Sequence, residues 1–361
     1  MGLPSIEAAV RTLFSKFLMW WFSAHEWSGA PLPDWRSRPF RILFIRDDGI
    51  GDLMVSMEII RAIAEVSPTF TVDLLCSPSN AAFGRSLPFV NDVIVHRRGA
   101  FLASWPVWRE LRRRKYDVVI DGRAAIGNVN KHTQALMLAT RAPWRIGLGG
   151  RRNDRVYNVP VRMDAVDHWI HAYVALGRPF GITQDSRDWR AKLPLSQEDR
   201  RRGEELWLLV EHGRPRVLVN LHSASSDREW PVDQFGEFLV YLRDRLPSAT
   251  IVLPAMPEGD DEAYQISMAA GAAVMPLKLD EVTALTAAAD LVVSPDTAIT
   301  VIASAFRIPI LALMRKNAGQ WEPYRMTGRI AFSDDEKSLR ALPTSRVVAA
   351  LDEIIAEQRW R

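Results

Sequence analysis

Three aspartates lie within one short segment of the sequence, RDDGIGDLM, which begins at Arg46. The apolar run RILFI precedes them and has the character of a strand buried on both faces. After them, Leu53, Met57 and Ile60 recur at three- and four-residue intervals, which predicts an amphipathic helix. Asp52 is therefore expected between the end of a strand and the start of a helix, where open α/β sheets bind their ligands.

A carboxylate in that position can accept a proton from a bound hydroxyl group, and a positioned general base typically contributes about 10²–10⁴-fold to a rate. We choose Asp52 because Gly49 and Gly51 frame its loop, where a tight turn with positive φ would favour glycine. Asp47 and Asp48 are rivals, and repulsion between like charges would raise the pKa of one of them. The plainer alternative is that Asp52 only caps the helix.

Two later segments have residues suited to an anionic ligand. In VLVNLHSASSDREWPV, an apolar run leads into a hydroxyl-rich loop that ends with Arg228, which offers a charge-assisted contact to a phosphate. In ADLVVSPDTAITVIASAF, the turn from Asp296 into a helix at Thr297 presents backbone N–H groups and the positive end of the helix dipole. Asp296 would itself repel a phosphate, so helix capping or a sugar hydroxyl suits it better.

Other patterns are less informative. The seven histidines are scattered, and no acidic DxD pair stands in a suitable strand–loop setting, so the sequence predicts no metal site. His168 and His171 have metal-like spacing without a third ligand, and we expect helix surface or inter-domain packing. The segment GLGG at 147–150 is interpreted as a turn without a preceding strand. The single cysteine, Cys76, excludes an internal disulfide.

The elements that must position these residues alternate along the chain. A length of 361 residues, 48% apolar and 25% charged, is typical of a globular protein with two domains. Apolar runs alternate with predicted helices, which favours doubly wound parallel sheets. The helices are expected at 53–66, 79–86, 104–114, 166–177, 232–246, 260–271, 280–289 and 297–306. The fold class is thus α/β, with two Rossmann-like domains facing a central cleft.

The predicted boundaries follow from composition. They are an N-terminal amphipathic extension and linker at 1–38, a domain at 39–185, a linker at 186–200, a domain at 201–340 and a C-terminal helix at 341–361. The apolar run from Phe17 to Phe22 is far shorter than the ~20 residues that span a bilayer. The first helix therefore either packs on the body of the protein or lies in a membrane interface.

The charge is mild, at +3, but arginines cluster in RELRRRKYD and RAPWRIGLGGRRNDR. These clusters are either solvated faces or a surface for an anionic partner, such as a phosphorylated acceptor or a membrane. We expect no nucleic acid partner.

The three segments, in this order and spacing, resemble those of glycosyltransferase family 9, the heptosyltransferases, over about residues 40–340. The resemblance implies a GT-B architecture with the acceptor in the N-terminal domain and a nucleotide sugar, typically ADP-heptose, in the C-terminal one. It also implies inversion at the anomeric carbon with no metal and no cofactor.

The resemblance assigns roles to individual residues. Asp52 aligns with the catalytic base. The expected donor-binding residues are Ser223, Arg228, Glu258, Asp296, Thr297, Ala298 and Thr300. The expected acceptor-binding residues are Arg46, Gly51, Arg123 and Lys131. Two positions depart from the pattern, because Ala298 and Val301 stand where the family commonly has glycine and histidine.

We therefore expect an inverting, metal-independent enzyme that transfers heptose from ADP-heptose to a lipid-linked acceptor such as the lipopolysaccharide inner core. It would work in the cytoplasm, at the inner face of the cytoplasmic membrane. The alternatives are another donor or acceptor on the same fold, or a non-catalytic nucleotide-sugar-binding homologue. Retention of Asp52, Arg228 and Asp296 together favours catalysis.

Overall fold

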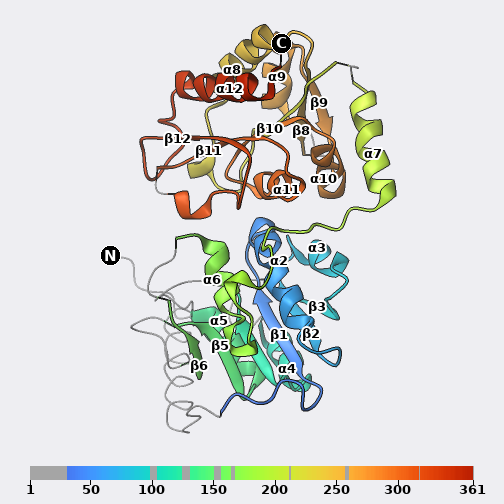
Figure 1. The fold of residues 1–361 in the computed structure, drawn as a ribbon, viewed down its shortest axis with the longest axis vertical. Helices are drawn as coiled ribbons and strands as arrows, with labels where there is room; N and C mark the ends of the chain where they lie inside the picture. Colours follow the sequence, from blue (N-terminus) through green and yellow to red (C-terminus); the bar gives the residue numbers. More distant parts are fainter. Residues whose placement is uncertain are drawn as a thin grey trace. The chain divides into compact units, whose positions relative to one another are not determined.

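The computed structural model describes residues 31–97, 104–123, 131–149, 156–163, 167–210, 213–256, 260–316 and 318–360. The predicted helix before residue 30 and Glu258 lie outside these residues. The chain divides into two compact units, Met1–Trp189 and Arg190–Arg361, each with its own sheet (Figure 1). No helix in the described part of the chain is long and apolar enough to span a bilayer.

The first unit contains a six-stranded sheet in the order β3-β2-β1-β4-β5-β6, and every neighbouring pair is parallel. Its strands are β1 (Arg41–Arg46), β2 (Thr71–Cys76), β3 (Asp92–Val95), β4 (Val118–Asp121), β5 (Trp144–Leu148) and β6 (Val159–Val161). Its α-helices are α2 (Ile50–Ala64), α3 (Ala81–Ser86), α4 (Trp105–Arg113), α5 (Lys131–Thr140) and α6 (Trp169–Ala175).

The second unit repeats this topology in the order β12-β11-β10-β7-β8-β9, again with parallel pairs. Its strands are β7 (Arg216–Val219), β8 (Thr250–Ala255), β9 (Ala273–Pro276), β10 (Leu291–Pro295), β11 (Ile310–Met314) and β12 (Gly328–Phe332). Its α-helices are α7 (Gln197–Leu208), α8 (Val232–Arg245), α9 (Asp261–Ala270), α10 (Leu279–Ala287), α11 (Ala298–Phe306) and α12 (Thr344–Gln358).

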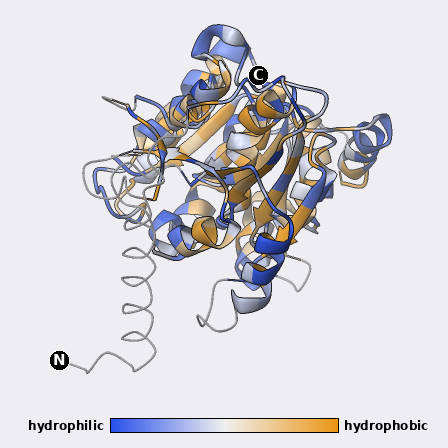
Figure 2. Cartoon of the chain, turned by 90° about the horizontal axis from the view of Figure 1, so that it is seen from below, coloured by the Kyte–Doolittle hydropathy of each residue, from blue (hydrophilic) through white to orange (hydrophobic). Residues whose placement is uncertain are grey.

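Both faces of the central strands of the second sheet are buried, which explains why these strands are largely apolar. Val217 and Val219 belong to a core cluster that also contains residues of α8, α9 and α12. Leu218, between them, belongs to a cluster with residues of α7, α10 and α11. Apolar residues colour much of the strands, and hydrophilic residues lie along the helices (Figure 2). The prediction of two doubly wound parallel sheets is confirmed.

Each sheet reverses its strand order at one point, between β1 and β4 in the first unit and between β7 and β10 in the second. In open α/β sheets, ligands bind outside the carboxyl ends of the strands at such a switch point. The three segments singled out in the sequence follow β1, β7 and β10, so each lies at a switch point.

Several elements differ from the sequence expectations. The first two residues of GLGG are the end of strand β5, so the interpretation of that segment as a turn without a strand was wrong on this point. Helix α5 was not predicted, nor were β6 and β12. Helix α7 begins at Gln197, inside the expected linker, and Ser196 caps it through a hydrogen bond from the Asp199 backbone N–H (3.0 Å).

Candidate active site

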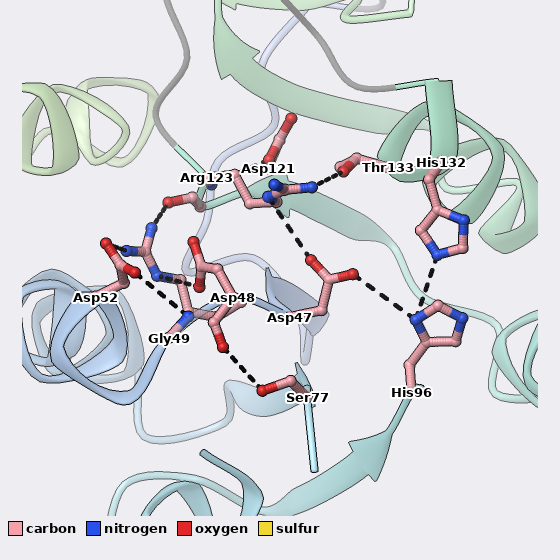
Figure 3. A network of polar contacts seen from close by, with 12 residues as sticks. Asp47, Asp48, Gly49, Asp52, Ser77, His96, Asp121, Arg123, His132 and Thr133 are labelled. Carbon is pink, nitrogen blue, oxygen red and sulfur yellow. Dashed lines mark hydrogen bonds and ion pairs between the residues drawn. The ribbon is translucent and has the colours of Figure 1, made fainter. Parts of the chain in front are cut away.

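Asp52 belongs to the first turn of α2, directly after the loop that follows β1 (Figure 3). Gly49 precedes the helix, and its backbone N–H donates to Asp52 Oδ2 at 3.3 Å. Gly49 has φ −76° and ψ 162°, so the expectation of positive φ was wrong. A Cβ at residue 49 would lie 3.0 Å from Asp52 Oδ2. Glycine is therefore suited here because the carboxylate folds back over it. Gly51 lies inside the helix.

Arg46 is the last residue of β1 and is completely buried. Its guanidinium pairs with Asp48 (Nε–Oδ1 3.2 Å) and Asp52 (Nη2–Oδ1 3.3 Å). It also donates to the Tyr173 hydroxyl at 3.1 Å and to the Gly122 carbonyl. Burial lowers the pKa of Arg46, but the nearby carboxylates and Tyr173 outweigh this and raise it above its usual value. Arg46 is thus a fixed cation that orients two carboxylates.

The three aspartates of this loop differ in how far solvent reaches them. The side chains of Asp47, Asp48 and Asp52 are 0%, 20% and 36% exposed. Burial raises the pKa of Asp48 to about 6. Asp52 is therefore the carboxylate of the loop that a substrate can reach most easily, which favours it over its two rivals as a base.

The loop after β4 lies beside the same cluster. Arg123 Nε is 3.7 Å from Asp47 Oδ1, and Arg123 Nη1 donates to the Thr133 hydroxyl at 3.2 Å. Asp121 accepts from the Arg123 backbone N–H at 3.0 Å and from the Tyr157 hydroxyl at 2.6 Å. Burial raises the pKa of Asp121. Two of the expected acceptor-binding residues therefore contact carboxylates of the loop after β1: Arg46 contacts Asp48 and Asp52, and Arg123 contacts Asp47. A third, Lys131, is the first residue of α5.

Two histidines that the sequence analysis treated as scattered come together beside Asp47. His96 directly follows β3, and His132 lies in the first turn of α5 (Figure 3). Their rings stack with centroids 4.6 Å apart. One signal was present in the sequence, since His96 ends the apolar run VNDVIVH and so stands at the carboxyl edge of the sheet. His168 instead caps α6, and His171 contacts Asp167 at 2.8 Å, as expected of a helix surface.

In the second unit, the segments after β7 and β10 meet through Arg228 and Asp296. Arg228 Nη1 lies 3.3 Å from the Asp296 backbone carbonyl and 3.5 Å from its carboxylate. These side chains are 30% and 24% exposed. Asn220, which the sequence analysis missed, donates to Ser294 Oγ (3.0 Å) and to Thr297 Oγ1 (3.4 Å). Its amide therefore links the carboxyl ends of β7 and β10.

Thr297, and not Asp296, caps helix α11. Its hydroxyl accepts from the Ile299 backbone N–H at 3.2 Å, so the suggestion that Asp296 is the cap was wrong. Ala298 is the first residue of the helix. Thr300 is buried, and its hydroxyl donates to the Thr297 carbonyl at 2.8 Å, so it is already engaged within the helix. Ser223 accepts from the Ser225 backbone N–H at 3.4 Å.

Comparisons with known proteins identify the family of this chain. Residues 104–343 match the family model described as glycosyltransferase family 9 (heptosyltransferase). The chain belongs to this family. It is a glycosyltransferase, and the matched stretch includes Arg228, Asn220 and the Asp296–Thr300 turn, while Asp52 lies before it.

Among curated proteins, this glycosyltransferase is similar to the lipopolysaccharide core heptosyltransferase OpsX of Haemophilus influenzae. The two are 18% identical over 292 residues, which cover 78% of this chain and 81% of OpsX.

Solved structures share the fold. A family 9 glycosyltransferase from Veillonella parvula superposes with a TM-score of 0.71 at 16% identity, covering 89% of this chain and 98% of that one. The ADP-heptose lipopolysaccharide heptosyltransferase II of E. coli gives 0.67 at 18% identity, covering 88% and 99%. E. coli WaaC with ADP-2-deoxy-2-fluoro heptose gives 0.65 at 17% identity, covering 87% and 99%. The GT-B prediction is confirmed.

Proposed function

We propose that this glycosyltransferase moves heptose from ADP-heptose to a hydroxyl group of a lipid-linked acceptor such as the lipopolysaccharide inner core. The observation that carries the proposal is the position of Asp52 at the switch point of the first sheet. Its carboxylate is the most exposed of the three in the loop, and Arg46 and the Gly49 N–H orient it. The relatives support the donor and acceptor classes by their names.

The proposed reaction is a single displacement. Asp52 removes the proton from the acceptor hydroxyl while that oxygen bonds to the anomeric carbon. The bond from that carbon to the ADP phosphate breaks, the electron pair leaves with ADP, and the configuration inverts. The proton ends on Asp52.

Charge stabilisation of the leaving ADP falls to the second unit in this proposal. Arg228 supplies a cation and the N-terminus of α11 supplies the positive end of a helix dipole at its switch point. We propose that these groups, and no metal ion, bind the pyrophosphate. Glu258 remains a proposed contact to adenine or ribose.

Binding of nucleotides tests the donor assignment. The full chain should be stabilised by ADP and by ADP-heptose, and not by UDP or GDP, in a thermal-shift experiment. At a nucleotide concentration of 100 Kd, binding adds about 2.7 kcal/mol to the stability, or roughly 5–10 °C for a unit of this size. Release of ADP should then require an acceptor. A response to none of the nucleotides would instead indicate a non-catalytic homologue.

A second candidate function rests on residues 298 and 301. Alanine in place of glycine at the start of α11 adds a methyl group where backbone approaches a phosphate, and valine provides no polar contact there. These changes favour a donor other than ADP-heptose on the same fold. Stabilisation by UDP or GDP, but not ADP, would select this alternative.

We also propose that the enzyme works in the cytoplasm and makes a peripheral contact with the inner face of the cytoplasmic membrane. Helix α4 exposes Trp105, at 61%, beside Arg109, Arg112 and Arg113, and an aromatic ring with cations suits an anionic lipid surface. Removal of residues 1–30 should weaken sedimentation with anionic liposomes. So should Trp105→Ser, whereas Tyr264→Ser on α9 should not. Sedimentation that neither change affects would contradict the proposal.

A further inference from the structure

Three side chains from three separate elements converge beside the acceptor-side loop. Asp47 comes from the segment after β1, His96 from the residue after β3, and His132 from the start of α5 (Figure 3). His132 Nε2 lies 3.3 Å from His96 Nδ1, and His96 Nδ1 lies 3.7 Å from Asp47 Oδ2. The ligand atoms of the three residues all lie within 4.8 Å of one another.

Two of these separations are close to those of metal ligands. Zinc binds nitrogen at ≈ 2.0–2.1 Å and carboxylate oxygen at ≈ 2.0–2.2 Å, so tetrahedral neighbours lie about 3.3–3.5 Å apart. The distance between the two nitrogens already has this value. The distance from His96 to Asp47 needs to shorten by only a few tenths of an ångström.

A hydrogen bond from the other ring nitrogen of His96 also fits a metal ligand. His96 Nε2 lies 3.3 Å from the Ser104 hydroxyl, and the ring is only 1% exposed. In the tautomer with its proton on Nε2, His96 donates to Ser104, and the Nδ1 lone pair faces Asp47 and His132. Metal-bound histidines almost always donate their other ring N–H in this way. The two carboxylate oxygens of Asp47 face different partners. Oδ1 lies 3.7 Å from Arg123 Nε, and Oδ2 lies 3.7 Å from His96 Nδ1.

The types of ligand atom indicate which metal ion could bind. Two imidazole nitrogens and one carboxylate suit Zn²⁺ and its first-row neighbours, whereas Mg²⁺ and Ca²⁺ prefer oxygen ligands. We propose that Asp47, His96 and His132 bind one zinc-class divalent ion, with an open fourth position. The ion would tie the carboxyl ends of β1 and β3 to α5 and so stabilise the segment that leads to Asp52. This site does not depend on the identity of the donor or acceptor.

The test uses the full, tag-free chain after removal of metal by a chelator. Zn²⁺ is titrated in competition with a chromogenic chelator, and Co²⁺ is added separately so that its visible spectrum reports the coordination number. We expect one Zn²⁺ per chain, a higher melting temperature, and a four-coordinate Co²⁺ spectrum.

Variants identify the ligands. His132→Gln should weaken Zn²⁺ binding more than about 100-fold, because loss of an outer partner already costs 10–100-fold. Ser104→Ala, which removes such an outer partner, should cost roughly tenfold or somewhat more. His171→Gln is the matched control, since that histidine also contacts an aspartate, at 2.8 Å, and should leave binding unchanged.

Circular dichroism establishes that each variant is folded. If His132→Gln fails to fold, Asp47→Asn replaces it, because asparagine keeps the shape of the side chain and loses the anionic ligand. A wild-type chain that cannot compete for Zn²⁺ would overturn the proposal. The same conclusion would follow if a folded His132→Gln or Asp47→Asn variant bound Zn²⁺ as tightly as wild type.

Discussion

Replacement of Asp52 by asparagine separates chemistry from structure at this site. Asparagine has almost the shape of aspartate, and its carbonyl oxygen can still accept the Gly49 N–H that Asp52 accepts at 3.3 Å. The substitution removes the negative charge and the ability to take up a proton. We expect transfer to be lost while the fold and the nucleotide affinity are retained.

The structure indicates the size of each effect. Arg46 keeps its partner Asp48 at 3.2 Å, and the lost pair involves an Asp52 side chain that is 36% exposed. Because Arg46 is completely buried, the lost contact is worth up to roughly 3 kcal/mol, so the melting temperature should fall by no more than about 12 °C. Turnover should fall by ~10²–10⁴-fold, the usual contribution of a general base. The variant should therefore remain folded at the assay temperature while its turnover is lost.

The assay measures ADP release with ADP-heptose and a soluble acceptor, alongside the dissociation constant of ADP. Asp199→Asn is a matched control, because Asp199 also lies in the first turn of a helix and accepts the N–H of its capping residue, at 2.8 Å. That variant should keep wild-type turnover. If Asp52→Asn retains more than about a tenth of wild-type turnover, Asp52 is not the base.

Three further predictions concern charge. Arg228→Ala should raise the dissociation constant of ADP about ten- to a hundredfold, since a charged hydrogen bond is worth ~1.5–3 kcal/mol; calorimetry showing no change would place the phosphate elsewhere. Addition of Mg²⁺ or Mn²⁺ should leave turnover unchanged, and a strict requirement for either ion would contradict the proposed role of Arg228. Burial raises the pKa of Asp48 from 3.8 to about 6, so the native state binds this proton more tightly than the unfolded chain does. Wild-type stability should therefore fall by up to about 3 kcal/mol as the pH rises from about 4 to above 6, and urea unfolding of Asp48→Asn should lack this component; an equal pH dependence in both would contradict it.

The positions of the main site residues were predictable because they depend on local pattern. An apolar run followed by polar residues and an amphipathic helix places Asp52 after β1, and the same logic places Arg228 after β7 and Thr297 after β10. Because parallel strands align their carboxyl ends at one edge, strand assignment alone brings these loops to the switch points.

The details that failed depend on side-chain positions that the sequence pattern does not encode, some of them local and some across the fold. Gly49 was linked to positive φ, but its reason is the carboxylate three residues later, which would meet a Cβ at 3.0 Å. The contact between His96 and His132 requires helix α5, and the pattern KHTQALMLAT has too weak an amphipathic signal to have been recognised. Asn220 was missed because its partners lie more than 70 residues away, Ser294 on β10 and Thr297 at the start of α11.

The two units show how one topology can serve two opposite electrostatic tasks. At the switch point of the first unit, carboxylates gather around the buried guanidinium of Arg46, which suits a proton acceptor. At the switch point of the second unit, positive charge comes from the N-terminus of α11 and from the half-buried Arg228, which suits an anion. In the proposed mechanism the base belongs to the first unit, because an unpaired carboxylate beside the leaving phosphate would repel it, whereas Asp296 of the second unit is paired with Arg228 at 3.5 Å. In the function that we propose, the repeated strand order with different loop residues thus separates proton acceptance from phosphate binding.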